Sequence, residues 1–187
     1  MDEQPSMSSV FSTRVLDVDY KYWRKNISIT DSATGRRLYS LGVDCRHSLL
    51  SAINEYGQAI GSSKVHSWSS RIDVQMTSTK DVSTTFDMRN RGILGGSPYY
   101  TSPAFDGQEM TWKNKAMSRK IIYTLIDGQG MALANFESDW KTKIGKLEVL
   151  PSITEEERVH EIVVTLLALL YRKLLSIQIA TTTAVTA

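Results

Sequence analysis

Along most of the chain, hydrophobic residues alternate with polar ones, which is the two-residue period of a β-strand with one buried face. The alternation is seen at Ile27 and Ile29, Ile72, Val74 and Met76, Phe86 and Met88, Met110 and Trp112, Tyr123 and Leu125, and Leu147 and Val149. Three segments, among them "TLIDGQGMALANF", also run from a strand through an Asp or Asn and a Gly into a second strand. Such segments are typical of β-hairpins. We therefore expect a mainly β, antiparallel domain.

One late segment has a different pattern and predicts a long helix over about 155–177. Glutamates occupy positions 155 to 157, where the helix dipole favours negative charge, and Arg172 and Lys173 lie towards the other end. At 1.5 Å per residue this helix is about 35 Å long. Pro151 lies just before it, which is consistent with a helix that begins after a turn.

The predicted helix is apolar over most of its circumference. At 100° per residue its polar side chains fall on one stripe about 60° wide; they are Arg158, Glu161, Thr165, Arg172 and Ser176. The residues expected to be buried are Ile162, Val163, Leu166, Leu167, Leu170 and Leu174. A helix on a protein surface has a broader polar face, so this pattern predicts burial on most sides. We expect the helix to be a structural element surrounded by sheet.

The same segment is too short to cross a membrane. Its uncharged run extends from Ile162 to Tyr171, about half of the roughly 20 residues that a spanning helix needs. The charged residues on both sides would enter hydrocarbon at a cost of roughly 2.5–3.5 kcal/mol each. The sequence therefore predicts no transmembrane span.

Length and composition indicate an ordinary globular domain. The chain has 187 residues, of which 41% are hydrophobic and 22% are charged. We expect a single domain over 11–177, with disordered ends at 1–10 and 178–187. One cysteine, Cys45, allows no internal disulfide and favours a reducing, intracellular compartment.

Nucleic acid is not the expected partner. A formal net charge of +2 is too small to indicate it. The aromatic residues Tyr20, Tyr22 and Trp23 lie near two bases, Arg24 and Lys25, and could stack on single-stranded bases. A barrel core uses the same residue types, however, and we interpret these aromatic residues as core.

The sequence contains no recognisable catalytic arrangement. Its three histidines are scattered without metal-ligand spacing, and it has neither a nucleophile elbow nor a phosphate loop. We therefore expect a protein that is not an enzyme and that holds no metal or cofactor. The Gly-, Pro- and Tyr-rich segment from Arg91 to Gly107 predicts a long surface loop. Such a loop could bind a protein partner, which is one alternative function.

Clusters of basic residues are the one lead towards a ligand. The segment "WKNKAMSRK" carries Lys113, Lys115, Arg119 and Lys120 with no acid between them. On a strand, Lys113 and Lys115 face outward, opposite to an inward Trp112. Two further groups are Arg36 and Arg37, and Lys141, Lys143 and Lys146. Several converging cations, each contributing about 1 kcal/mol, attract a protein to an anionic surface. The alternative interpretation is an ordinary surface of mixed charge.

The order of these elements resembles that of fungal tubby C-terminal-like proteins, which are related to tubby, the phospholipid scramblases and the LURP-one-related proteins. The resemblance is carried by "EMTWK", "YTLIDGQGMALANFES", "GKLEVLP" and "EIVVTLLALLYRK", within Met110 to Leu174. It implies a closed antiparallel β-barrel wrapped around a hydrophobic C-terminal helix. The fold expected from the residue pattern is the same.

The resemblance also implies candidate functions. Tubby-type domains bind phosphoinositide headgroups through exterior basic residues, so Lys113, Lys115, Arg119 and Lys120 are the expected headgroup-binding residues. The protein is then cytoplasmic and peripheral at the plasma membrane. A protein-interaction or adaptor domain without a lipid role is the first alternative. The second is a scramblase-like membrane protein, but the chain has one cysteine where scramblases have a cluster, and no calcium loop with EF-hand spacing.

Overall fold

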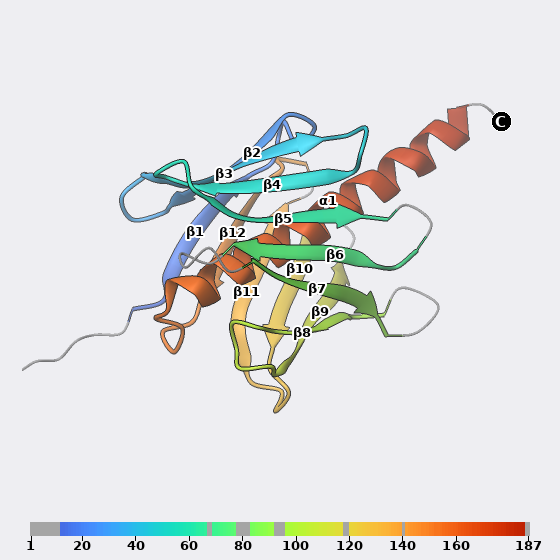
Figure 1. Ribbon diagram of the computed structural model, residues 1–187. Helices are drawn as coiled ribbons and strands as arrows, with labels where there is room; N and C mark the ends of the chain where they lie inside the picture. Colours follow the sequence, from blue (N-terminus) through green and yellow to red (C-terminus); the bar gives the residue numbers. More distant parts are fainter. Residues whose placement is uncertain are drawn as a thin grey trace, which may run out of the picture.

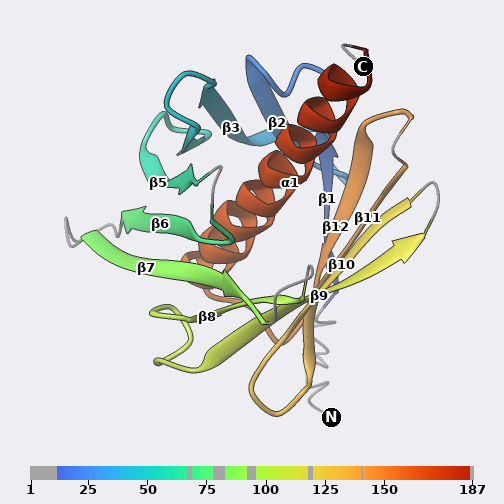
Figure 2. The ribbon, with the colours of Figure 1, turned by 90° about the vertical axis from the view of Figure 1, so that its right-hand side faces the viewer.

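The protein is a closed β-barrel with a long helix running through it (Figures 1 and 2). The computed structural model describes residues 12–66, 69–77, 83–91, 96–117, 120–139 and 141–185. Within these residues, twelve antiparallel strands each pair with their neighbour in sequence, and β1 pairs with β12 to close the ring. The predicted fold class, a mainly β barrel around a hydrophobic C-terminal helix, is confirmed.

The elements follow one another in a simple up-and-down order. The strands are β1 (Arg14–Asp19), β2 (Asn26–Asp31), β3 (Arg37–Asp44), β4 (Leu49–Asn54), β5 (Ala59–Val65), β6 (Ile72–Thr77), β7 (Ser83–Asn90), β8 (Pro98–Thr101), β9 (Glu109–Met117), β10 (Lys120–Ile126), β11 (Ala132–Asp139) and β12 (Ile144–Val149). The helix α1 spans Glu156–Val185. Because every connection joins adjacent antiparallel strands, successive turns lie at alternate ends of the barrel.

The alternating positions face the interior as the sequence predicts. Nearly all of them are buried, with Phe86 only partly so. The three predicted hairpins are the β2–β3, β4–β5 and β10–β11 turns. In each, an Asp or Asn side chain accepts backbone N–H groups of the turn. A glycine with positive φ follows in all three (Gly35, Gly57 and Gly130). The side-chain acceptor and the glycine thus define each turn.

The helix is buried on nearly all sides. The side chains predicted to be buried, Ile162, Val163, Leu166, Leu167, Leu170 and Leu174, are at most 3% exposed. The polar stripe is also buried in its middle, where Glu161 and Thr165 are fully inaccessible. The stripe faces the wall near β8 and β9, where Thr165 accepts a hydrogen bond from the Trp112 indole at 3.1 Å. Polar residues on this helix therefore bond to the barrel wall.

Three parts of the chain differ from expectation or cannot be compared with it. The helix continues to Val185 instead of ending at about 177, because no Gly or Pro follows Ile177 to terminate it. The predicted loop from Arg91 to Gly107 contains the short strand β8, whose Tyr100 packs into the core. The N-terminal segment 1–10, predicted to be disordered, lies outside the described residues.

The sequence predicts no transmembrane span, and the described part of the chain agrees: it contains no helix with the apolar length that crossing a bilayer requires.

Candidate functional site: a basic rim at the helix-exit end

The helix α1 runs along the barrel and distinguishes its two ends. At one end α1 begins, and the Arg14 guanidinium donates a 2.9 Å hydrogen bond to Glu156. At the other end α1 leaves the barrel, and Arg172 donates hydrogen bonds of 3.0 Å to the Ser70 carbonyl and to the Asn90 side chain. We name these the helix-start end and the helix-exit end. The C-terminal part of α1 projects beyond the strands at the helix-exit end (Figure 1).

The helix-start end carries more acidic than basic residues. Its acidic residues are Asp31, Glu55, Asp106, Glu109, Asp127, Glu155, Glu156 and Glu157, and its basic residues are Arg14, Arg36, Arg37 and Arg158. Three of these bases are held by acids: Arg14 by Glu156, as described above, Arg36 by Glu55 at 2.7 Å, and Arg158 by Glu155 at 3.0 Å. The field at this end is therefore negative.

At the helix-exit end, by contrast, basic residues predominate along about half of the circumference. Four consecutive connections around the ring (β9–β10, β11–β12, β1–β2 and β3–β4), together with the outer faces of β9 and β12 beside them, carry a series of bases, which we name the basic rim. Its described members are Lys21, Arg24, Lys25, Arg46, Lys113, Lys115, Lys120, Lys141, Lys143 and Lys146. All are exposed except Lys143, which is half-buried.

Contacts between the connections show that the rim is continuous. The Tyr20 N–H of the β1–β2 loop donates a 3.0 Å hydrogen bond to the Lys143 carbonyl of the β11–β12 turn. On its other side, the β1–β2 loop meets the β3–β4 turn, where the Cys45 thiol lies 3.6 Å from the Arg24 carbonyl. Lys120 is the register partner of Asp139, which places the β9–β10 hairpin beside the β11–β12 turn. These bases thus share one surface.

The residues predicted to bind a headgroup are only partly brought together. Lys113 and Lys115 project from β9 as exposed side chains and have no acid within ion-pair distance among the described residues. Lys120 is paired with Glu137. Arg119 lies outside the described residues.

The other two basic groups of the sequence are separated from one another. Lys141 and Lys143 join the basic rim. Lys146 also belongs to it, on the outer wall of β12, because its register partner Glu137 is linked through β10 to the level of Lys115. Arg36 and Arg37 lie at the opposite end of the barrel. Sequence reasoning did not assign Lys21, Arg24, Lys25 and Arg46 to the site. The segment "YKYWRK" indicates bases near aromatic residues, but not which end of the barrel they occupy.

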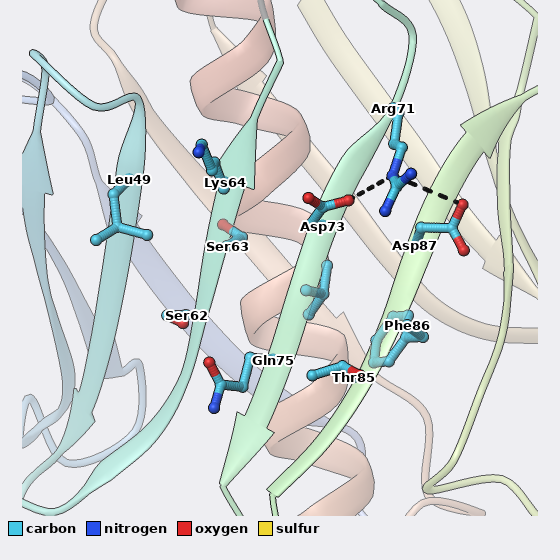
Figure 3. A pocket seen from close by; sticks show the side chains of 11 residues that line it. Leu49, Ser62, Ser63, Lys64, Arg71, Asp73, Gln75, Thr85, Phe86 and Asp87 are labelled. Atoms are coloured by element: carbon cyan, nitrogen blue, oxygen red, sulfur yellow. Dashed lines mark hydrogen bonds and ion pairs between the residues drawn. The ribbon is translucent and has the colours of Figure 1, made fainter.

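Another candidate surface is a polar groove of about 500 Å³ on the outer face of β4 to β7 (Figure 3). Arg71 lies between two carboxylates in it, with its Nε 2.5 Å from Asp73 and 4.0 Å from Asp87. His66 lies 2.7 Å from the same Asp73. Because these charges largely satisfy one another, the groove is a weaker anion site than the rim.

A buried carboxylate holds the β8–β9 connection against the helix. Glu161 accepts hydrogen bonds from the Ser102 hydroxyl and from the Ala104 N–H, the latter at 3.1 Å. Burial raises the pKa of Glu161, although these hydrogen bonds partly offset the effect. Arg158 donates to the Ala104 carbonyl at 3.1 Å and lies over the Phe105 ring. The C-terminal part of the predicted surface loop is therefore attached to α1.

We expect the Glu161→Gln substitution to stabilise the protein more at pH 7 than at pH 5. Folding raises the pKa of this carboxyl, so its ionised form destabilises the folded state. This destabilisation disappears as the pH falls through the raised pKa towards the usual value of 4.5, because the carboxyl becomes protonated. Glutamine has the shape of the protonated acid and carries no such cost. Urea denaturation of both proteins at the two pH values measures the difference. An equal difference in free energy of unfolding at both pH values would contradict a raised pKa.

Comparisons with known proteins identify the fold but no family. No known family model matches the chain, and no curated protein matches its sequence. The chain is similar to the X-ray structure of a protein from Arabidopsis thaliana, with a TM-score of 0.50 and 14% sequence identity. The similarity covers 82% of this chain and 89% of that one. At this identity the likeness concerns the fold alone.

Proposed function

We propose that this protein is a non-enzymatic, tubby-like binding module that docks reversibly on anionic phosphoinositide membranes through the basic rim. The observation that carries the proposal is the continuity of the rim. It brings Lys113 and Lys115 onto one surface with bases from three other connections. The resemblance to tubby C-terminal-like proteins agrees with the barrel and with a phosphoinositide ligand. In this proposal the protein is cytoplasmic and associates with the plasma membrane peripherally.

The charges of the rim are available to a ligand. Among the described residues, Arg24, Lys25, Arg46 and the two β9 lysines have no carboxylate within ion-pair distance. A phosphoinositide headgroup carries several negative charges on a small area, so it can neutralise several bases at once. Each base near an anionic surface contributes about 1 kcal/mol, and binding of this kind weakens as salt screens the charges.

Lys115→Glu is expected to weaken binding to phosphoinositide vesicles by roughly tenfold or more. The change removes one attractive charge and adds a repulsive one, and a tenfold change corresponds to about 1.4 kcal/mol. Arg37→Glu is the matched control, because Arg37 is also an exposed strand residue and its reversal changes the net charge equally. Co-sedimentation with vesicles measures both. Equal weakening by the two variants would show that net charge, and not the rim, governs binding.

A further inference from the structure

Three turns of the basic rim have the same local construction. Each begins with an aspartate whose side chain accepts the backbone N–H two residues later, and that later residue is basic. The pairs are Asp19 with Lys21 at 3.0 Å, Asp44 with Arg46 at 2.9 Å, and Asp139 with Lys141 at 2.6 Å. The aspartate fixes the turn, and the exposed base projects from it. The aspartates are not buried by this arrangement: Asp44 and Asp139 are exposed, and the Lys21 ammonium lies 4.0 Å from the Asp19 carboxylate. Each turn therefore presents a basic side chain beside the acid that fixes its backbone.

The helix-start end uses the same turn without the base. Asp31, Asn54 and Asp127 also accept the N–H two residues later. The residues in the equivalent position there are Ala33, Tyr56 and Gln129. Turn geometry therefore does not require a basic residue at this position. The three bases are a property of the helix-exit surface and point to an anionic partner that faces the basic rim.

The β1–β2 loop adds an exposed aromatic residue to this surface. Tyr20 and Trp23 are buried, with the Tyr20 hydroxyl 2.7 Å from Ser138 and the Trp23 ring edge-on to Tyr171. Between these two anchors, Tyr22 is 72% exposed, with Lys21 directly before it and Arg24 two residues after it. The loop is also held by hydrogen bonds from Lys25 and Asn26 to the Tyr22 carbonyl. The loop therefore presents Tyr22 outward in a fixed conformation, so binding does not incur the entropy cost of ordering the loop.

We propose that the basic rim meets the membrane, with the barrel tilted so that both Tyr22 and the projecting C-terminal part of α1 (Figure 1) reach the lipid–water interface and the acidic helix-start end is directed towards the cytosol. This inference rests on the proposed function and adds the orientation and the contact residues. The β1–β2 loop that carries Tyr22 lies between the β11–β12 and β3–β4 turns, which carry Lys141 and Arg46, and tyrosine favours the headgroup level of a bilayer. The opposite charges of the two ends favour one orientation over an anionic surface.

The contribution of Tyr22 is tested with a matched pair of variants. Tyr22→Ser is expected to weaken binding to phosphatidylcholine vesicles that contain a few per cent phosphatidylinositol bisphosphate by several-fold. Tyr56→Ser is the control, since Tyr56 is 76% exposed in a turn at the helix-start end, and it should leave binding unchanged. Neither residue is a core side chain, so both variants should fold. No loss with Tyr22→Ser, or an equal loss with both, would overturn the insertion of Tyr22.

The orientation is tested with the exposed native thiol. Cys45 lies in the β3–β4 turn of the rim and is the chain's one cysteine, so a polarity-sensitive fluorophore can be attached there. The control is Cys45→Ser combined with Gln129→Cys, which moves the label to the helix-start end. On the same vesicles, the label at 45 should shift to the blue and the label at 129 should not. Equal shifts, or a shift at 129 alone, overturn the orientation while docking stands. Failure of the unlabelled protein to sediment with the vesicles overturns both proposals.

Discussion

Replacing Leu167 by aspartate is expected to abolish folding. Leu167 is fully inaccessible in the middle of α1, with the barrel around it. An aspartate there places a charge among apolar side chains, where it finds neither water nor a partner. The cost of several kcal/mol, added to the lost apolar contacts, is comparable to the whole stability of about 5–15 kcal/mol that a domain of this size has.

The measurement is circular dichroism and thermal unfolding of the purified variant. Leu175→Asp is the control, because this residue lies on the same helix near the helix-exit end and is only partly buried. It should fold with a modest loss of stability. A Leu167→Asp variant that unfolds as cooperatively as the unmodified protein would show that α1 is not the core of the barrel.

Gly145→Ala is expected to destabilise the protein by about 1–3 kcal/mol, the usual cost of overpacking a core. Gly145 faces inward on β12, and the buried Phe136 of β11 lies across it. A Cβ at this glycine would lie 2.4 Å from the Phe136 ring and 2.7 Å from the Ser138 Cβ. Alanine suits a strand better than glycine does, so a loss of stability must come from the steric conflict.

A second substitution separates this conflict from other causes. Combining Gly145→Ala with Phe136→Leu removes the ring that the new methyl group meets. The double variant should therefore lose less free energy of unfolding than the sum of the two single variants. Chemical denaturation of the unmodified protein, the two single variants and the double variant gives the coupling free energy between the two substitutions. Additive losses would mean that Phe136 is not the group that excludes a side chain at Gly145.

Much of the fold is predictable from local patterns. Period-two alternation identifies strands such as Ile72–Thr77, because alternate side chains of the strand are buried in the barrel interior. Asp or Asn followed by Gly identifies three of the turns. The nearly continuous apolar circumference of α1 indicates that it is enclosed. These features follow from the local sequence and from the requirement to bury apolar surface.

Features that depend on distant residues are not predictable in this way. The partner of Glu161, Ser102, lies in a segment that the sequence predicts as a loop. The same segment contains the short strand β8, which the sequence pattern does not predict. Omitting this strand changes the expected position of the candidate site. Successive turns alternate between the ends of the barrel, so omitting one strand moves every later turn to the wrong end. Without β8, the hairpin that carries Lys113 and Lys115 would be placed opposite to the β1–β2 loop.

The most direct test of the account is co-sedimentation of the purified protein with phosphatidylcholine vesicles, with and without a few per cent phosphoinositide, at low and at high salt. We expect binding that requires the phosphoinositide and that falls steeply as salt rises, because the rim acts through exposed charges. A folded protein that stays in the supernatant under all conditions, or that binds equally without phosphoinositide and in high salt, would contradict membrane docking through the basic rim.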